Sequence, residues 1–247
     1  MKRVYTCLII VLIISANSTI KINAQSKTIK LNLRIHIMQT TPWIHSSGVS
    51  MNSWVTSNDV TEVIMPELNK IWSQANIIWN VESIIKEDIV IFEGQNEAIS
   101  YIIDSKRDSE GRSDKERLPH LYSLMQPQNR SKKKKIDSNL YHIYLFPFIG
   151  NTSQGNAMKK FGRHAIVGIW SNKHNRGNSP EKTLLKEDYD LWKRGSLSRT
   201  IAHELGHVLR LTHNQCSICL MKGRGYMITT EQIKISRKEA KRRLKNI

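Results

Sequence analysis

The sequence predicts an α+β fold built on a twisted, mixed and mostly parallel sheet, with one backing helix and a second helix that carries a histidine motif. Apolar and polar residues alternate over 29–37, which is the pattern of a half-buried strand. Apolar residues at helical spacing follow over 58–75, and a second strand is predicted over 77–85. A strand, a helix and a strand in this order indicate a parallel βαβ unit.

The helix over 58–75 has a predicted start and a predicted irregularity. Ser57 or Asn58 is suited to cap its first turn. Pro66 lies inside the apolar pattern, so we expect a kink there or a later start. Two further strands are predicted over 141–148 and 165–170, because short apolar runs are typical of strands covered on both faces.

The last part of the chain is predicted to hold two more helices. Ser196 or Ser198 would cap a helix that runs through Val208. A basic helix is predicted over about 230–245. Together with the strands, these helices complete the predicted architecture, in which a small C-terminal subdomain follows the sheet.

The composition allows a folded core and carries a large positive charge. Of 247 residues, 39% are hydrophobic, which argues against wholesale disorder. The formal net charge of +17 comes from 38 Lys and Arg against 21 Asp and Glu. The polar stretches 104–139 and 171–195 are predicted surface loops, and the first contains the run Lys132–Lys135. The basic residues of the tail are Arg237, Lys238, Lys241, Arg242, Arg243 and Lys245.

These basic regions are interpreted mainly as solvated faces, with attraction to anionic surfaces or polyanions as the alternative. No aromatic residues interleave with the lysines, so the stacking platform of a single-strand nucleic-acid binder is missing. No specific nucleic-acid partner is therefore expected.

The first 24 residues read as a signal peptide. Lys2 and Arg3 give a basic start, and the apolar run 4–14 is too short to span a bilayer. Small and polar residues follow, with Ala24 as the expected cleavage position. We expect a secreted or periplasmic chain over 25–247, with no transmembrane span after cleavage.

The mature chain would keep two cysteines, Cys216 and Cys219, because Cys7 lies in the leader. In an oxidising compartment this pair is expected to form a local disulfide. The competing interpretation is a cysteine-type zinc site, which lacks the two further cysteines that such sites usually have.

The segment from His203 to His207 is an HExxH motif. On a helix the two histidines are one turn apart and face the same way, so both imidazoles can reach one Zn²⁺. Glu204 is rotated by about 100° from His203, where its carboxylate can contact a water at the metal.

His213 is the candidate third ligand. It follows His207 by six residues, and six helical steps rotate by about 240°, away from the metal. The helix must therefore end near Leu209 or Arg210 and turn back. Three histidine ligands with an open fourth position are typical of catalytic rather than structural zinc.

The run from His203 to His213 resembles the metzincin zinc peptidases, whose motif is HExxHxxGxxH followed by a methionine turn; here the motif reads HExxHxxRxxH. Leu220 and Met221 are similar to that turn. The segment 67–75 and the strand after it look like the backing helix and second strand of matrixin-like members.

The resemblance implies a zinc metalloendopeptidase with one catalytic Zn²⁺ on His203, His207 and His213. It implies Glu204 as general base, Met221 as a packing residue, and a protein or peptide substrate lying along an edge strand, expected between 152 and 161. The implied catalytic domain spans 25–247, with an N-terminal subdomain of about 25–209 and a C-terminal one of about 210–247.

Two departures from the family pattern bear on the site. Arg210 stands where the family has a glycine, at a cost of about 1–2 kcal/mol if the backbone there is left-handed. Gly223 stands where some relatives have a tyrosine ligand, which leaves Tyr226 as a substitute or a packing residue.

Three other interpretations stay open. The first is a metzincin fold that has lost activity and serves as a binding module. The second is a basic, secreted polyanion-binding protein with a structural zinc. The third is a gluzincin-type site, with Glu231 or Glu239 as the distant ligand.

The remaining histidines lack ligand spacing. His36, His142 and His164 fall in predicted strands and are interpreted as ordinary surface or partly buried residues. His45, His120 and His174 fall in predicted loops and are interpreted in the same way.

Overall fold

The protein is described by a computed structural model. The described residues are 27–39, 43–44, 50–51, 53–88, 140–147, 155–157, 162–169, 197–214, 216–222 and 225–245. The predicted signal peptide, the stretch 104–139 and the stretch 171–195 lie outside them. So do the lysine run 132–135 and the loop histidines.

The sheet is mixed and mostly parallel, as predicted. Its strand order is β4-β1-β5-β7-β6, and all neighbours are parallel except β6, which runs antiparallel to β7 at the edge. A separate two-stranded ribbon pairs β2 with β3. The strands are β1 Ile29–Gln39, β2 Trp43–Ile44, β3 Ser50–Met51, β4 Ile77–Asp88, β5 Tyr141–Phe146, β6 Gly155–Ala157 and β7 His164–Gly168.

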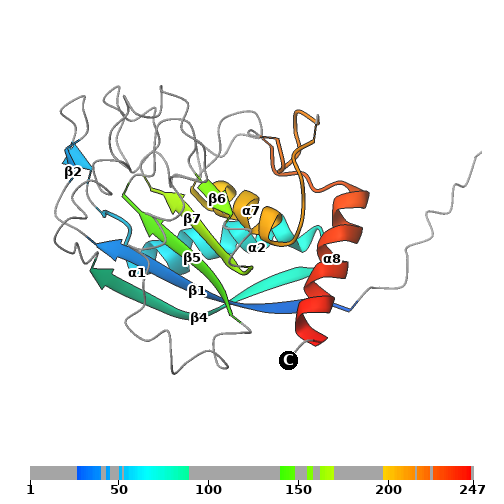
Figure 1. The fold of residues 1–247 in the computed structure, drawn as a ribbon, viewed down its shortest axis with the longest axis horizontal. Coiled ribbons are helices and arrows are strands. Elements are labelled where there is room, and N and C mark those ends of the chain that lie inside the picture. Colours follow the sequence, from blue (N-terminus) through cyan, green and yellow to red (C-terminus); the bar gives the residue numbers. More distant parts are fainter. Residues whose placement is uncertain are drawn as a thin grey trace, which may run out of the picture.

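The helical segments are α1 Ser57–Asp59, η1 Val60–Ile64, α2 Met65–Ser73, α7 Leu197–Val208 and α8 Thr230–Lys245. In Figure 1, α2 and α7 lie together along the sheet, and α8 stands across its end. The apolar side chains of α2, α7 and the facing side of the strands form one buried core. The longest element, α8, was predicted with the same bounds.

The helix after β1 differs from the prediction at its start. Thr56, rather than Ser57 or Asn58, is the N-cap, and it forms a capping box with Asp59. Five residues of π-helix then precede α2, and Pro66 follows in the first turn of α2. The expected irregularity at Pro66 is thus a widened turn before the proline, which has no N–H to donate.

The end of α2 leads directly into β4, and this completes the predicted βαβ unit. Asn76 has a φ of +49°, and its carbonyl accepts a hydrogen bond of 2.9 Å from the N–H of Ile29 at the start of β1. Among the described residues, no helix combines the length and hydrophobicity that crossing a bilayer requires.

Candidate metal centre

The helix that carries His203 and His207, α7, ends at Val208, and the chain turns before it reaches His213. Arg210 has a φ of +67°. Its N–H donates to the carbonyl of His207 over 2.9 Å, and the N–H of Leu211 donates to the carbonyl of Gly206 over 2.8 Å. This pair of bonds is a Schellman motif, which closes a helix and turns the chain away from its axis.

The three histidines of the motif converge through their Nε2 atoms. His213 Nε2 lies 3.1 Å from Nε2 of His203 and 3.1 Å from Nε2 of His207. His203 Nδ1 is 2.7 Å from the carbonyl oxygen of Leu220, and His207 Nδ1 is 2.8 Å from that of Leu211. Since a carbonyl can only accept, both Nδ1 atoms carry the proton and both Nε2 atoms keep a free lone pair.

A single cation fits this arrangement. His213 Nε2 can donate a hydrogen to only one of the two lone pairs that face it, whereas a metal ion satisfies all three nitrogens. Tetrahedral zinc sites with Zn–N distances of 2.0–2.1 Å hold their nitrogens about 3.3 Å apart. Burial lowers the pKa of His203 to about 3, so its ring is neutral at pH 7, which is the form that binds metal.

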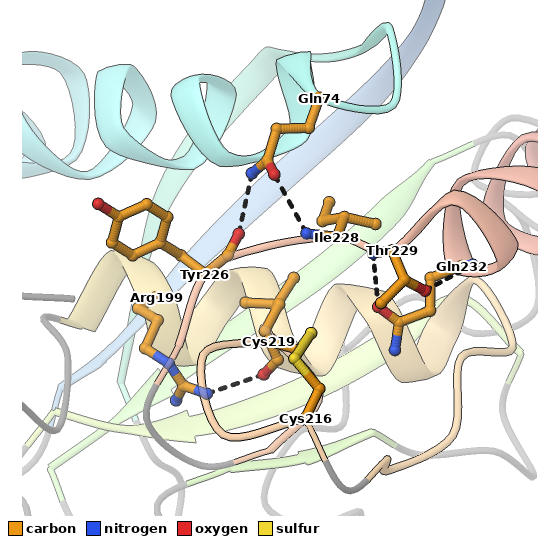
Figure 2. The surroundings of a disulfide bond; sticks show 9 residues. Gln74, Arg199, Cys216, Cys219, Tyr226, Ile228, Thr229 and Gln232 are labelled. Carbon is orange, nitrogen blue, oxygen red and sulfur yellow. Dashed lines mark hydrogen bonds between the residues drawn. A yellow bond between two sulfur atoms is a disulfide. The ribbon is translucent and has the colours of Figure 1, made fainter. Parts of the chain in front are cut away.

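The carbonyl oxygen of Leu220 holds His203 in place. Besides the bond from His203, it accepts one of 2.8 Å from Nη2 of Arg199. The buried Arg199 guanidinium also donates from Nε to the carbonyl of Gly225 over 2.7 Å. Figure 2 shows Arg199 reaching from α7 into the segment that carries the disulfide. Arg199 therefore fixes the chain at Leu220 and at Gly225, on either side of Met221.

That segment is held by a disulfide and by a glutamine from α2. Cys216 and Cys219 are joined by a disulfide. The Gln74 side chain donates from Nε2 to the carbonyl of Tyr226 over 2.9 Å, and its Oε1 accepts from the N–H of Ile228 over 3.1 Å (Figure 2). Gln74, at the end of α2, thus fixes residues 226–228, which follow the segment whose Leu220 carbonyl orients His203.

Met221 packs directly beneath α7. Its side chain is fully buried. A Cβ added to Gly206 would lie 2.6 Å from Met221 Sδ, so the motif position between Leu205 and His207 requires a glycine for close packing.

Glu204 lies on the side of α7 that faces the edge strand. Its side chain is buried, and a Cβ added to Gly155 in β6 would lie 2.5 Å from Glu204 Oε1 and 2.6 Å from its Cγ. The carboxylate therefore packs against bare backbone in β6. Gly155 lies within the 152–161 range expected for the edge strand.

The alternative ligands are not brought to the metal centre. Glu231 is exposed in the first turn of α8. Glu239 is buried under arginines, and hydrogen bonds from Arg242 and then Arg243 lower its pKa to about 2. Tyr226 packs against the core. Within the described part of the chain, the one group of His, Cys, Asp or Glu with metal-ligand spacing is His203, His207 and His213.

The arginine in the position of the family's glycine makes a tertiary contact. Arg210 has the left-handed backbone that the motif glycine would adopt. Its Nε lies 3.3 Å from Glu239 Oε1 in α8, although the Arg210 side chain is 69% exposed. An ion pair this exposed contributes little, about 0–1 kcal/mol. It offsets only part of the backbone cost, so the turn does not depend on the arginine.

Replacing Arg210 by glycine is therefore expected to leave the melting temperature unchanged or to raise it slightly. Arg210→Ala is the matched control, because alanine loses the ion pair and keeps the left-handed backbone, at a cost of about 1 kcal/mol relative to glycine. Thermal unfolding followed by circular dichroism measures both. A glycine variant less stable than the alanine variant would contradict this account of the turn.

A second set of histidines is buried away from the metal centre, which corrects the interpretation of two of them as surface or partly buried residues. His36 Nδ1 lies 2.7 Å from Glu87 Oε1, and its Nε2 lies 3.0 Å from His142 Nδ1. His142 stacks on His164 with ring centroids 4.5 Å apart and an interplanar angle of 6°. His36 and His142 are 4% and 5% exposed. The histidine row consists of His36 in β1, His142 in β5 and His164 in β7, and Glu87 in β4 extends it across the sheet.

Sequence reasoning missed several residues that build the site. Arg199 could have been found, because it lies four residues before His203 and so on the same face of the helix. Gln74 and Gly155 gave no local signal, because their partners are distant along the chain. The histidine row was missed for the same reason, since His36 and His142 are 106 residues apart.

Comparisons with known proteins add the following similarities. No protein-family model matches the sequence, and no curated protein matches it. Among solved structures, an archaemetzincin from Methanopyrus kandleri is similar, with 14% identity, a TM-score of 0.45, and coverage of 88% of this chain and 98% of that one. A zinc-dependent peptidase from Methanocorpusculum labreanum has 14% identity, a TM-score of 0.39, and coverage of 84% and 99%. A chaperone–substrate complex has 11% identity, a TM-score of 0.39, and coverage of 88% and 35%.

The sheet topology and the three converging histidines define the chain as a mixed α/β domain with a candidate metal centre. The parallel strands support α7, and α7 carries two of the three histidines. The third histidine follows the Schellman turn.

Proposed function

We propose that this chain is a secreted zinc-dependent endopeptidase of metzincin type, with Glu204 as its general base. The observation that carries the proposal is the convergence of three Nε2 atoms, from His203, His207 and His213, beside a helix that also carries Glu204. Backbone carbonyls orient two of the three imidazoles, which turns Nε2 of His203 and of His207 toward His213.

The three histidines would hold one Zn²⁺ and leave a fourth position open. Bound there, Zn²⁺ supplies Lewis-acid chemistry, because it lowers the pKa of a water toward about 7 and polarises the carbonyl to be cleaved. Arg199 and the Leu220 carbonyl keep the His203 ring in the tautomer that leaves Nε2 free.

Glu204 would take the proton from the attacking water and pass it to the leaving amine. The Glu204 side chain lies against Gly155, which supports a role for this carboxylate beside the edge strand β6. β6 is the terminal strand of the five-stranded sheet, next to β7. An extended peptide would lie along this strand and add β-type hydrogen bonds. The proposed substrate is accordingly a protein or peptide in extended form.

The finer assignments belong to the same proposal. Met221 would be the methionine of a Met-turn in a matrixin-like catalytic domain over 25–247, divided near residue 210. The residues 1–24 would direct export and be removed. Attraction of the basic regions to an anionic partner is a second proposal, and it does not depend on catalysis.

The test of the peptidase proposal is Glu204→Gln. This variant keeps the size of the side chain and removes the base, so peptide hydrolysis is expected to fall about 10²- to 10⁴-fold while one zinc per chain remains bound. Cleavage of a diverse peptide library, followed by mass spectrometry, measures activity, and elemental analysis measures zinc.

Glu231→Gln, at an exposed glutamate of α8, is the matched control and should retain full activity. Removal of metal by a chelator should abolish cleavage, and added zinc should restore it. Zinc binding without any cleavage by the unmodified chain would favour the inactive binding module over the enzyme.

A further inference from the structure

The basic residues of α8 fall into two groups with different surroundings. Arg237 is buried, and its guanidinium donates to the carbonyls of Ala75 over 2.6 Å and Lys27 over 2.9 Å. Arg243 donates to the carbonyl of Val208 over 2.9 Å. These two arginines attach α8 to the rest of the domain, because their guanidinium groups donate to backbone carbonyls outside α8.

The lysines of α8 are all exposed and form a stripe along the helix. Their spacing of four, three and four residues places them within an arc of about 60° and over a length of about 16 Å. No hydrogen bond or ion pair joins their side chains to another residue in the part of the chain that the structure describes. The lysine stripe consists of Lys234, Lys238, Lys241 and Lys245.

The lysine stripe opposes the stability of the helix that carries it. Lys234 and Lys238 are neighbours at i,i+4, as are Lys241 and Lys245, and like charges at this spacing destabilise a helix. The helix dipole favours cations in the last turn, which accounts for Lys245 and not for the other three. A local arrangement that works against its own helix points to a ligand that compensates for it.

The acidic residues of α8 do not neutralise the stripe. Glu239 is buried on the other side of the helix, where Arg210, Arg242 and Arg243 bind it. Glu231 is exposed in the first turn and lies three residues before Lys234, so it can offset the charge of that lysine alone. The exposed side of α8 therefore presents a line of positive charge to an external anion.

We propose that the lysine stripe binds a linear acidic polysaccharide through its sulfate or carboxylate groups. The axial steps between successive lysines are about 6, 4.5 and 6 Å, so a chain with closely repeated charges can contact all four. The exposed large apolar residues of the described part are Met227, Ile235 and Leu244. None of them is aromatic, so this part of the chain offers bases no exposed stacking platform.

A membrane surface fits this side of α8 less well. Ile235 and Leu244 each lie about 90° from the centre of the stripe, on opposite sides of it. The helix therefore lacks the continuous apolar face with which interfacial helices enter a bilayer. The proposal concerns binding alone. A result on polysaccharide binding therefore neither supports nor contradicts the proposed peptide hydrolysis.

The experiment compares the full chain with the variant K234Q/K238Q/K241Q/K245Q. Heparin is the sulfated probe and polygalacturonate the carboxylated probe, each titrated at several salt concentrations. The variant is expected to bind at least about tenfold more weakly at 0.1 M salt and to show a smaller salt dependence. Its melting temperature should be unchanged or higher, because the like-charge neighbours are gone.

The matched control K27Q/K30Q/K70Q/K86Q removes the same charge from exposed lysines elsewhere and should bind as the unmodified chain does. Equal loss in both variants would reduce the effect to net charge and overturn the proposal. Loss only when Lys132–Lys135 are replaced would overturn it too. Stripe-dependent binding that is tighter for single-stranded DNA or anionic vesicles would assign the stripe to another partner.

Discussion

Gly155→Ala is expected to reduce peptide hydrolysis by at least about tenfold while leaving one zinc per chain bound. The added Cβ would fall 2.5 Å from Glu204 Oε1, so the carboxylate must move. A displacement of about 1 Å at a catalytic group can cost about 100-fold in rate. The metal ligands are untouched, because none of them is among the atoms that the Cβ would meet. Steady-state kinetics and zinc analysis on the same sample measure both quantities.

A stability cycle with Glu204→Ala tests whether the clash is the cause. Alone, Gly155→Ala should lower the free energy of unfolding by about 1–3 kcal/mol, which is typical of overpacking. In a Glu204→Ala background the space is free, so the same change should cost much less. If Gly155→Ala costs the same in both backgrounds, or is fully active, β6 does not position the carboxylate.

Acidification is expected to destabilise the metal-free fold, with a large contribution from the buried histidine row. Burial, followed by the charges of His164 and His36, lowers the pKa of His142 from 6.5 to about 2. Between these values the unfolded chain binds a proton that the folded chain does not. The stabilising contribution is therefore complete above pH 6.5 and declines as the pH falls toward 2. At pH 4.5 the loss from His142 is about 3 kcal/mol.

Urea unfolding of the metal-free chain at pH 7 and pH 4.5 measures this loss. His142→Gln removes the titrating group and keeps a donor for His36, so the difference in stability between the two pH values should shrink by about 3 kcal/mol. His203 also has a lowered pKa, and it contributes equally to both proteins. Identical pH dependence of the variant and the unmodified chain would show that His142 does not protonate on unfolding.

The parts of this protein that follow from local sequence are those set by residues within a turn or a strand of one another. The alternation over 29–37 corresponds to β1, and the basic segment 230–245 forms α8 with the expected bounds. The HExxH spacing puts His203 and His207, the first two candidate ligands, on one face of α7. Local reasoning was less accurate at the start of the helix after β1, because Thr56, Ser57 and Asn58 are all capable caps and only the capping box with Asp59 distinguishes them.

The tertiary structure decided how these local elements meet. It brought Nε2 of His213 to 3.1 Å from Nε2 of His203 and of His207 after the Schellman turn. It placed Gly155 against Glu204, and it joined His36 to His142 across the sheet.

The physical reason lies in the range of the two kinds of information. Propensity, capping and periodicity act over a few residues and can be read along the chain. Strand order, close backbone approach and hydrogen bonds between distant segments arise only when one buried core forces separate elements together. The sequence by itself therefore determined which side chains could bind a metal, and the packing of α7 against the sheet and the segment that contains Met221 decided where they converge.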